Sequence, residues 1–121
     1  MNEEDRLYKI HAEFCQTLAN PKRLKIINLL SRREMQVNEI AEAMGIKKAN
    51  LSQHLSVMRQ KGIVATRREG VNVYYRINKS KIVRACEIIR DALHEQLSTD
   101  ERLVRSAITK SGNALKIMSG R

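Results

Sequence analysis

The sequence has few aromatic residues and few cysteines, and it lacks a long apolar run. It contains no tryptophan, one phenylalanine and three tyrosines, so its core must be mostly aliphatic, which favours packed helices. The two cysteines, Cys15 and Cys86, lie far apart in the sequence and are too few for a disulfide framework. No run of about 18 apolar residues occurs, and the acidic start lacks the order of a signal peptide. We therefore expect a cytoplasmic protein that neither enters a membrane nor is exported.

The charge is strongly positive and is concentrated in the middle of the chain. The 121 residues suit one domain and carry a formal net charge of +10. Residues 21–78 hold twelve basic and four acidic side chains, whereas residues 1–20 hold two and four. Such a charge suits a polyanion, and nucleic acid is the first candidate. The asymmetry indicates a basic central module flanked by segments with another role, most simply self-association.

The spacing of the apolar residues predicts a mainly α protein with one small β-hairpin. Helices are expected at residues 4–18, 21–31, 37–44, 48–61 and 80–97, with a sixth beginning near residue 98. Asn20 and Pro21 mark a helix start, and Gly45 and Gly62 mark helix ends. After Gly62 the period changes to two, which predicts strands at residues 63–68 and 73–77. The expected core positions of the second and fourth helices are Leu24, Ile27, Leu29, Leu30, Leu51, Leu55 and Met58.

Three helices followed by a hairpin, with a tight turn at Gly45, is the element order of a winged helix-turn-helix module. We assign residues 1–97 to a DNA-binding and dimerisation domain and residues 98–121 to a helical extension. The helix at residues 48–61 has one apolar face for docking and small polar side chains in its N-terminal half, as a helix that reads the major groove requires. The candidate DNA-binding residues are Lys47, Lys48, Asn50, Ser52, Gln53, His54, Arg67 and Arg68.

Each of these side chains has a chemistry suited to DNA. Asn50 and Gln53 can bond adenine bidentately, Ser52 can donate to phosphate or base, and the two lysines can neutralise phosphates. The two arginines precede the turn at Gly70 and can follow the DNA backbone or reach the minor groove. His54 either contacts a phosphate or orients its neighbours.

Three segments of the sequence resemble the ArsR/SmtB family of repressors. They are residues 18–30 (LANPKRLKIINLL), residues 51–64 (LSQHLSVMRQKGIV) and residues 67–77 (RREGVNVYYRI), and the resemblance covers roughly residues 7–97 in one register. It implies a homodimeric repressor of five or six helices whose first and fifth helices form the dimer interface. It also implies release from DNA by an inducer and, through the two-fold symmetry of a dimer, a near-palindromic operator.

The metal-binding positions of that family are altered in this sequence. Metal-sensing members carry Cys-Val-Cys in the helix before the turn, where this chain reads EMQVNEI at residues 34–40. The amides of Gln36 and Asn38 cannot replace a pair of thiolates for soft metals. A second site of the family uses Asp-x-His and a later His-x-x-Glu, but Asp91 and His94 are three residues apart and no second histidine follows. We therefore expect neither a bound metal nor another cofactor.

The two cysteines have two alternative roles. The resemblance implies that the helices carrying Cys15 and Cys86 come together at the dimer interface. A pair of thiols there could report an oxidant, a persulfide or a thiophilic ion by forming a bridge. The alternative is that both are small buried core residues, as free cysteines usually are.

The sequence thus predicts a sequence-specific DNA-binding transcriptional repressor. Its partners would be double-stranded DNA, a second copy of the chain, and a small-molecule or redox inducer. The alternative function is a winged-helix module that coats DNA without sequence preference or assembles with other proteins. We expect no enzymatic activity, because no Gly-rich phosphate loop, paired-carboxylate site or Cys-His-Asp signature occurs.

Overall fold

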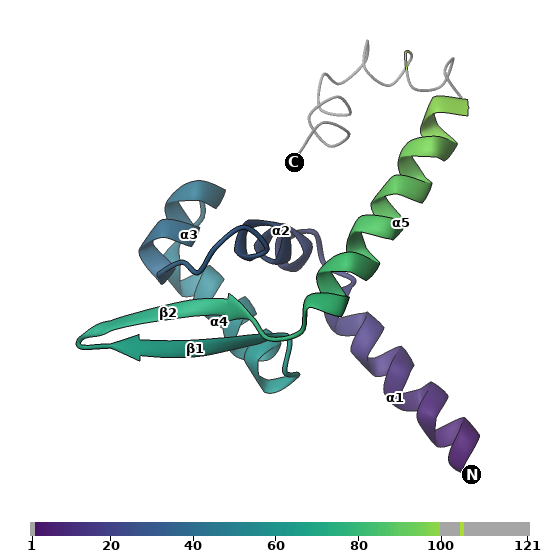
Figure 1. Ribbon diagram of the computed structural model, residues 1–121, viewed down its shortest axis with the longest axis horizontal. Helices are drawn as coiled ribbons and strands as arrows, with labels where there is room; N and C mark the ends of the chain where they lie inside the picture. Colours follow the sequence, from purple (N-terminus) through teal and green to yellow (C-terminus); the bar gives the residue numbers. More distant parts are fainter. Residues whose placement is uncertain (1, 100–104, 106–121) are drawn as a thin grey trace. The chain divides into compact units, whose positions relative to one another are not determined.

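The computed structural model describes residues 2–99 and residue 105, which contain the helices and the hairpin of a winged helix-turn-helix (Figure 1). The predicted fold class is therefore confirmed. The chain divides into two compact units, the first of which ends at Val83. In chain order the elements are α1 (Glu3–Leu18), α2 (Pro21–Leu30), α3 (Val37–Met44), α4 (Lys48–Gln60), β1 (Val64–Glu69), β2 (Asn72–Ile77) and α5 (Ser80–Thr99).

The helix boundaries follow from local capping residues that can be recognised in the sequence. The Oδ1 atom of Asn20 accepts hydrogen bonds from the backbone N–H groups of Lys22 and Arg23, at 3.0 and 3.2 Å, and Pro21 occupies the first helical position of α2. Gly45 ends α3 with a φ of 66°, a left-handed conformation that a side chain would strain. α5 extends through Thr99, so the prediction that a new helix begins near residue 98 is wrong. Of the remaining part of the predicted sixth helix, the structure describes only Arg105, which is helical.

A segment outside the hairpin also forms backbone hydrogen bonds with it, which the sequence did not predict. β1 and β2 pair antiparallel from Val64 opposite Ile77 to Glu69 opposite Asn72. Met35, in the connection between α2 and α3, also forms an isolated bridge with Tyr75. Its N–H donates to the Tyr75 carbonyl at 3.1 Å, and the Tyr75 N–H donates to the Met35 carbonyl at 2.8 Å. This bridge ties the hairpin to the helix-turn-helix.

The hydrophobic core of the first unit draws on α2, α3, α4 and the start of β1. The prediction that Leu24 is a core residue is wrong, because its side chain is 43% exposed. The buried face of α2 is centred on Ile26, Ile27 and Leu30, and Leu24 is turned away from it around the helix. Leu29 is only partly buried. The buried hydrophobic residues are Ile26, Ile27, Leu30, Met35, Ile40, Ala41, Leu51, Leu55, Met58, Ile63 and Val64.

Large apolar side chains remain exposed on α1 and on α5. Leu7 and Ile10 on α1 are 66% and 56% exposed. Those on α5 are Ile88, Ile89, Leu93 and Leu97. None of the described helices combines the length and the apolar character needed to cross a bilayer. Exposed apolar faces of this kind are typical of surfaces that another protein surface covers.

Candidate DNA-binding interface

α4 is divided into a buried face and a polar exposed face. Leu51, Leu55 and Met58 are at most 1% exposed and fix the helix on the core. Gln53 lies two residues from both leucines, so it points to the opposite side of the helix, where it is exposed. Six of the eight predicted DNA-binding residues belong to this helix or its N-cap. Lys47 is the N-cap, and Lys48, Asn50, Ser52, Gln53 and His54 follow within the first two turns.

The first turn of α2 contributes a cation to the edge of α4. Lys22 is exposed, and its Nζ atom donates a hydrogen bond to Oδ1 of Asn50 at 2.9 Å. Asn50 keeps both amide donors and one further lone pair on Oδ1. Sequence reasoning missed Lys22, because the two residues are 28 positions apart and no local pattern pairs them.

The next residue of α2 makes a second bond to α4. The Nε atom of Arg23 donates to Nδ1 of His54 at 3.1 Å, and its NH1 group donates to the backbone carbonyl of Thr17 at 3.1 Å. The pKa of His54 is lowered from its ordinary value, first by burial and then by the positive charges of Arg23 and Lys22. The imidazole is therefore neutral at neutral pH.

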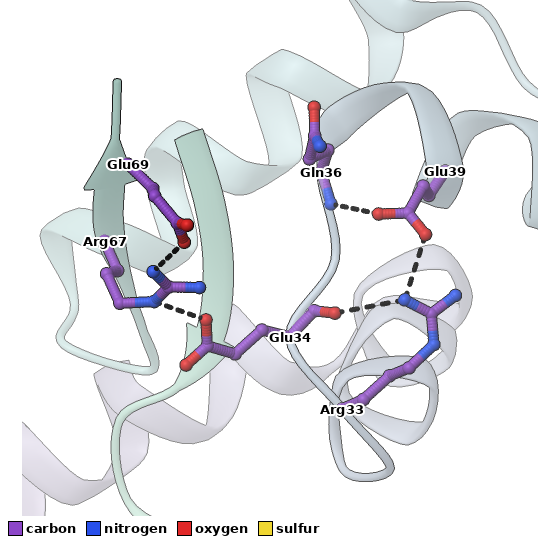
Figure 2. A network of polar contacts seen from close by, with 6 residues as sticks. All are labelled: Arg33, Glu34, Gln36, Glu39, Arg67 and Glu69. Carbon is purple, nitrogen blue, oxygen red and sulfur yellow. Dashed lines mark hydrogen bonds and ion pairs between the residues drawn. The ribbon is translucent and has the colours of Figure 1, made fainter. Parts of the chain in front are cut away.

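The two arginines of β1 differ in their partners. Figure 2 shows the Arg67 guanidinium between two carboxylates, with Glu34 and Glu69 each at 2.8 Å. Arg67 also lies over the ring of Tyr74, 4.6 Å from its centroid. These hydrogen bonds raise the pKa of Arg67, with Glu69 as the larger cause and Glu34 next. Arg68 is exposed and forms no ion pair with any residue that the structure describes.

A second set of polar contacts holds the start of α3. Arg33 donates to the backbone carbonyl of Glu34 at 3.2 Å and pairs with Glu39 at 2.9 Å (Figure 2). The backbone N–H of Gln36 donates to Glu39 at 3.0 Å. The hydrogen bond from the Gln36 backbone, followed by that from Arg33, lowers the pKa of Glu39. The segment that precedes α3 is thus linked both to α3 and, through Glu34, to the hairpin.

The cysteines are not core residues of the single chain. Cys15 is exposed and Cys86 is partly buried. Burial raises the pKa of the Cys86 thiol, and the nearby charge of Arg90 opposes this shift. Asp91 and His94 are both exposed on α5. Within the described part of the chain, no three His, Cys, Asp or Glu side chains are grouped as a metal site would require.

Comparison with known proteins identifies the same module. Residues 20–66 match the sequence model of the family described as bacterial regulatory protein, arsR family. The chain is 38% identical over 113 residues to Rv0081 of Mycobacterium tuberculosis, which is described as an uncharacterized HTH-type transcriptional regulator. The matched region covers 93% of this chain and 98% of Rv0081. The crystal structure of Rv0081 has a TM-score of 0.72 to this chain, covering 78% of this chain and 95% of that one at 40% identity.

Two further proteins extend the comparison. The solution structure of the homodimeric winged helix-turn-helix DNA-binding domain of Mb0332 from Mycobacterium bovis has a TM-score of 0.73 and 32% identity, with 80% of this chain and 90% of that one covered. The transcriptional repressor SmtB homolog of Synechocystis is 34% identical over 84 residues, 69% of this chain and 64% of that protein. On these matches and on its fold, the chain belongs to the ArsR family of winged helix-turn-helix transcriptional regulators.

Proposed function

We propose that this chain is a homodimeric transcriptional repressor that binds a near-palindromic operator through α4 and the hairpin. The observation that carries the proposal is the division of α4. Leu51, Leu55 and Met58 are buried, whereas Gln53 and Ser52 are exposed on other faces. A helix that is docked by one face and polar on the other meets the requirements of major-groove readout.

The proposed contacts follow from exposure and from existing bonds. The side-chain amide of Gln53 has no hydrogen bond to any described residue, so both ends of this amide are available to an adenine edge. Lys47 and Lys48 are exposed at the N-terminal end of α4 and neutralise phosphates that flank the groove. Ser52 donates to a phosphate or a base. Of the two predicted arginines of the hairpin, Arg68 is the one whose charge is not already balanced by carboxylates.

Dimerisation would cover the apolar faces of α1 and α5. The domain of Mb0332 is described as homodimeric, and the exposed Leu7, Ile10, Ile89 and Leu93 supply apolar surface that a second copy can bury. A two-fold dimer presents two copies of α4 to successive major grooves. The operator half-sites should then be about 34–36 Å apart, one helical turn of DNA or a multiple of it.

The test is fluorescence anisotropy of the protein on DNA from upstream of its own gene, against a scrambled duplex of equal length. A repressor should prefer the operator by at least about a thousandfold at fixed salt. Gln53→Ala should reduce this preference, whereas Gln60→Ala, which removes an exposed glutamine at the other end of α4, should not. Equal affinity for both duplexes would instead support the coating or assembly module.

We further propose that a thiol-reactive oxidant releases the repressor through Cys15 and Cys86. A peroxide would accept two electrons and two protons from the two thiols, giving one disulfide and two water molecules. The exposure of Cys15 supports its access to such an oxidant. Peroxide should lower operator affinity in the unaltered protein, and a Cys15→Ser or a Cys86→Ser change should abolish the effect. Release that persists in both variants would assign the inducer to another site.

A further inference from the structure

The side chain of Arg23 is held by one hydrogen bond to α1 and one to α4. It lies in the first turn of α2, where Asn20 and Pro21 fix the backbone. Its NH1 group is bound to the carbonyl of Thr17 in α1, and its Nε to Nδ1 of His54 in α4. All three elements belong to the first unit. The guanidinium therefore has a defined place beside the imidazole.

The bond from Arg23 decides which nitrogen of His54 carries the proton. The guanidinium has five N–H donors and no acceptor. Nδ1 of His54 must therefore offer its lone pair to Arg23, and a neutral imidazole with a lone pair on Nδ1 carries its hydrogen on Nε2. The charged groups that act on the ring, Arg23 and Lys22, are both positive and oppose a second proton.

Nε2 of His54 is the part of the ring that remains available to a ligand. It has no hydrogen bond to any described residue. No described side-chain nitrogen or oxygen is both fully buried and without a partner, so Nε2 reaches solvent. His54 lies one residue after Gln53, on the flank of α4 that faces Lys22 and Arg23.

We propose that Arg23 is a positioning residue for DNA recognition, which holds His54 as the Nε2–H tautomer so that α4 presents one fixed hydrogen-bond donor to an acceptor on DNA. This inference rests on the proposed function. Lys22 acts in parallel on Asn50: its Nζ atom donates to Oδ1, and both amide N–H donors of Asn50 stay available. The first turn of α2 thereby determines the donor pattern on one flank of α4.

The tautomer is tested on the free protein, without DNA. Long-range ¹H–¹⁵N correlation spectra at pH 7.5 distinguish the two neutral tautomers, and the signals of His54 among the three histidines are identified by their loss in His54→Gln. We expect a protonated Nε2 and an unprotonated Nδ1. In Arg23→Met, which keeps an unbranched stem but no donors, the ring should show a mixture of tautomers. A ring protonated on Nδ1 in the unaltered protein would overturn the inference.

The coupling to DNA is tested by a double-mutant cycle of Arg23→Met and His54→Ala in operator binding. Loss of one positioned hydrogen bond should weaken binding by about tenfold in the Arg23 variant. In the His54→Ala background the same change should cost about twofold or less, because the residue that Arg23 positions is gone. Lys25→Met removes an exposed positive charge from the same helix and serves as the control for charge loss alone.

The outcomes separate the inference from the proposed function. Additive losses in the cycle, or a loss in Lys25→Met equal to that in Arg23→Met, would overturn the positioning role while leaving the repressor in place. If the unaltered protein fails to distinguish operator from scrambled DNA, the proposed function fails and takes the DNA role of His54 with it, whatever tautomer the spectra show. Selective binding, an Nε2–H ring and a non-additive cycle together support the inference.

Discussion

Replacing Arg68 by methionine should reduce the salt dependence of DNA binding, whereas replacing Arg67 should leave it nearly unchanged. The two arginines are adjacent on β1 and point to opposite faces of the hairpin. Arg67 has Glu34 and Glu69 each at 2.8 Å, so its charge is already compensated by two carboxylates. Arg68 has no ion pair with a described residue. Of these two arginines, only Arg68 therefore offers an uncompensated charge to a phosphate.

The magnitude follows from counterion release. One phosphate contact contributes about 0.9 to the slope of log affinity against log salt on duplex DNA. Salt lowers the affinity between 50 and 200 mM, a fourfold range. With one phosphate contact fewer per protomer, this loss of affinity is smaller by a factor of about 3.5 for each protomer. Arg68→Met should therefore lower the slope by about 0.9 per protomer, and Arg67→Met by a small fraction of that value.

The assay is anisotropy titration of the operator at four salt concentrations, with the unaltered protein and both variants measured side by side. Glu34→Gln provides a further comparison, because it removes one carboxylate from Arg67 and should steepen the slope slightly. Equal reductions in slope for the two arginine variants would show that Arg67 also neutralises a phosphate when DNA is bound. The division of roles on the hairpin would then be refuted.

Four further expectations can be checked with single variants. Gln53→Ala should cost roughly 1 to 3 kcal/mol of specific binding, measured as the operator-to-scrambled affinity ratio. Leu93→Glu removes from each protomer one leucine that the dimer would bury. The free energy of dimerisation should weaken by about 3 kcal/mol, which raises the dimer Kd by roughly two decades as measured by sedimentation. Because the pKa of His54 is lowered in the folded protein, the unfolded chain takes up a proton there more readily. The free energy of unfolding, measured by urea titration, should therefore fall as the pH drops below about 6.5, and should fall less in His54→Gln. Because burial raises the pKa of Cys86, iodoacetamide at pH 7.5 should alkylate it faster in urea, measured by mass spectrometry in Cys15→Ser.

The parts of the fold that the sequence predicted depend on short-range chemistry. Asn20 and Pro21 specify a helix start through bonds within three residues, and Gly45 specifies a helix end through its own φ. Leu24 was misassigned because a count of apolar residues in α2 does not show where the centre of the buried face lies. That centre is set by what α2 packs against, and Ile26, which the prediction omitted, is fully buried there.

The candidate interface was predicted only in part, for a related reason. The residues of α4 form a pattern along the chain, so they could be found without a structure. The partners that orient them could not, because Lys22 and Asn50 are 28 positions apart and Arg23 and His54 are 31. The bonds of a basic side chain are decided by folding, and lysines and arginines occur throughout this chain. A charge count therefore identifies the ligand class but not the role of each cation.

The segment before α3 joins the hairpin to the helix-turn-helix. Just before Gln36 and Asn38, where the resemblance would put thiolate ligands, Glu34 is paired with the hairpin and the backbone of Met35 is bridged to β2. The next residues hold the start of α3, since the Gln36 N–H is bound by Glu39, which pairs with Arg33. The contacts between this segment and the hairpin thus come from Glu34 and Met35, directly before those two positions. A ligand that bound here would have to compete with the bonds that tie the hairpin to the helix-turn-helix.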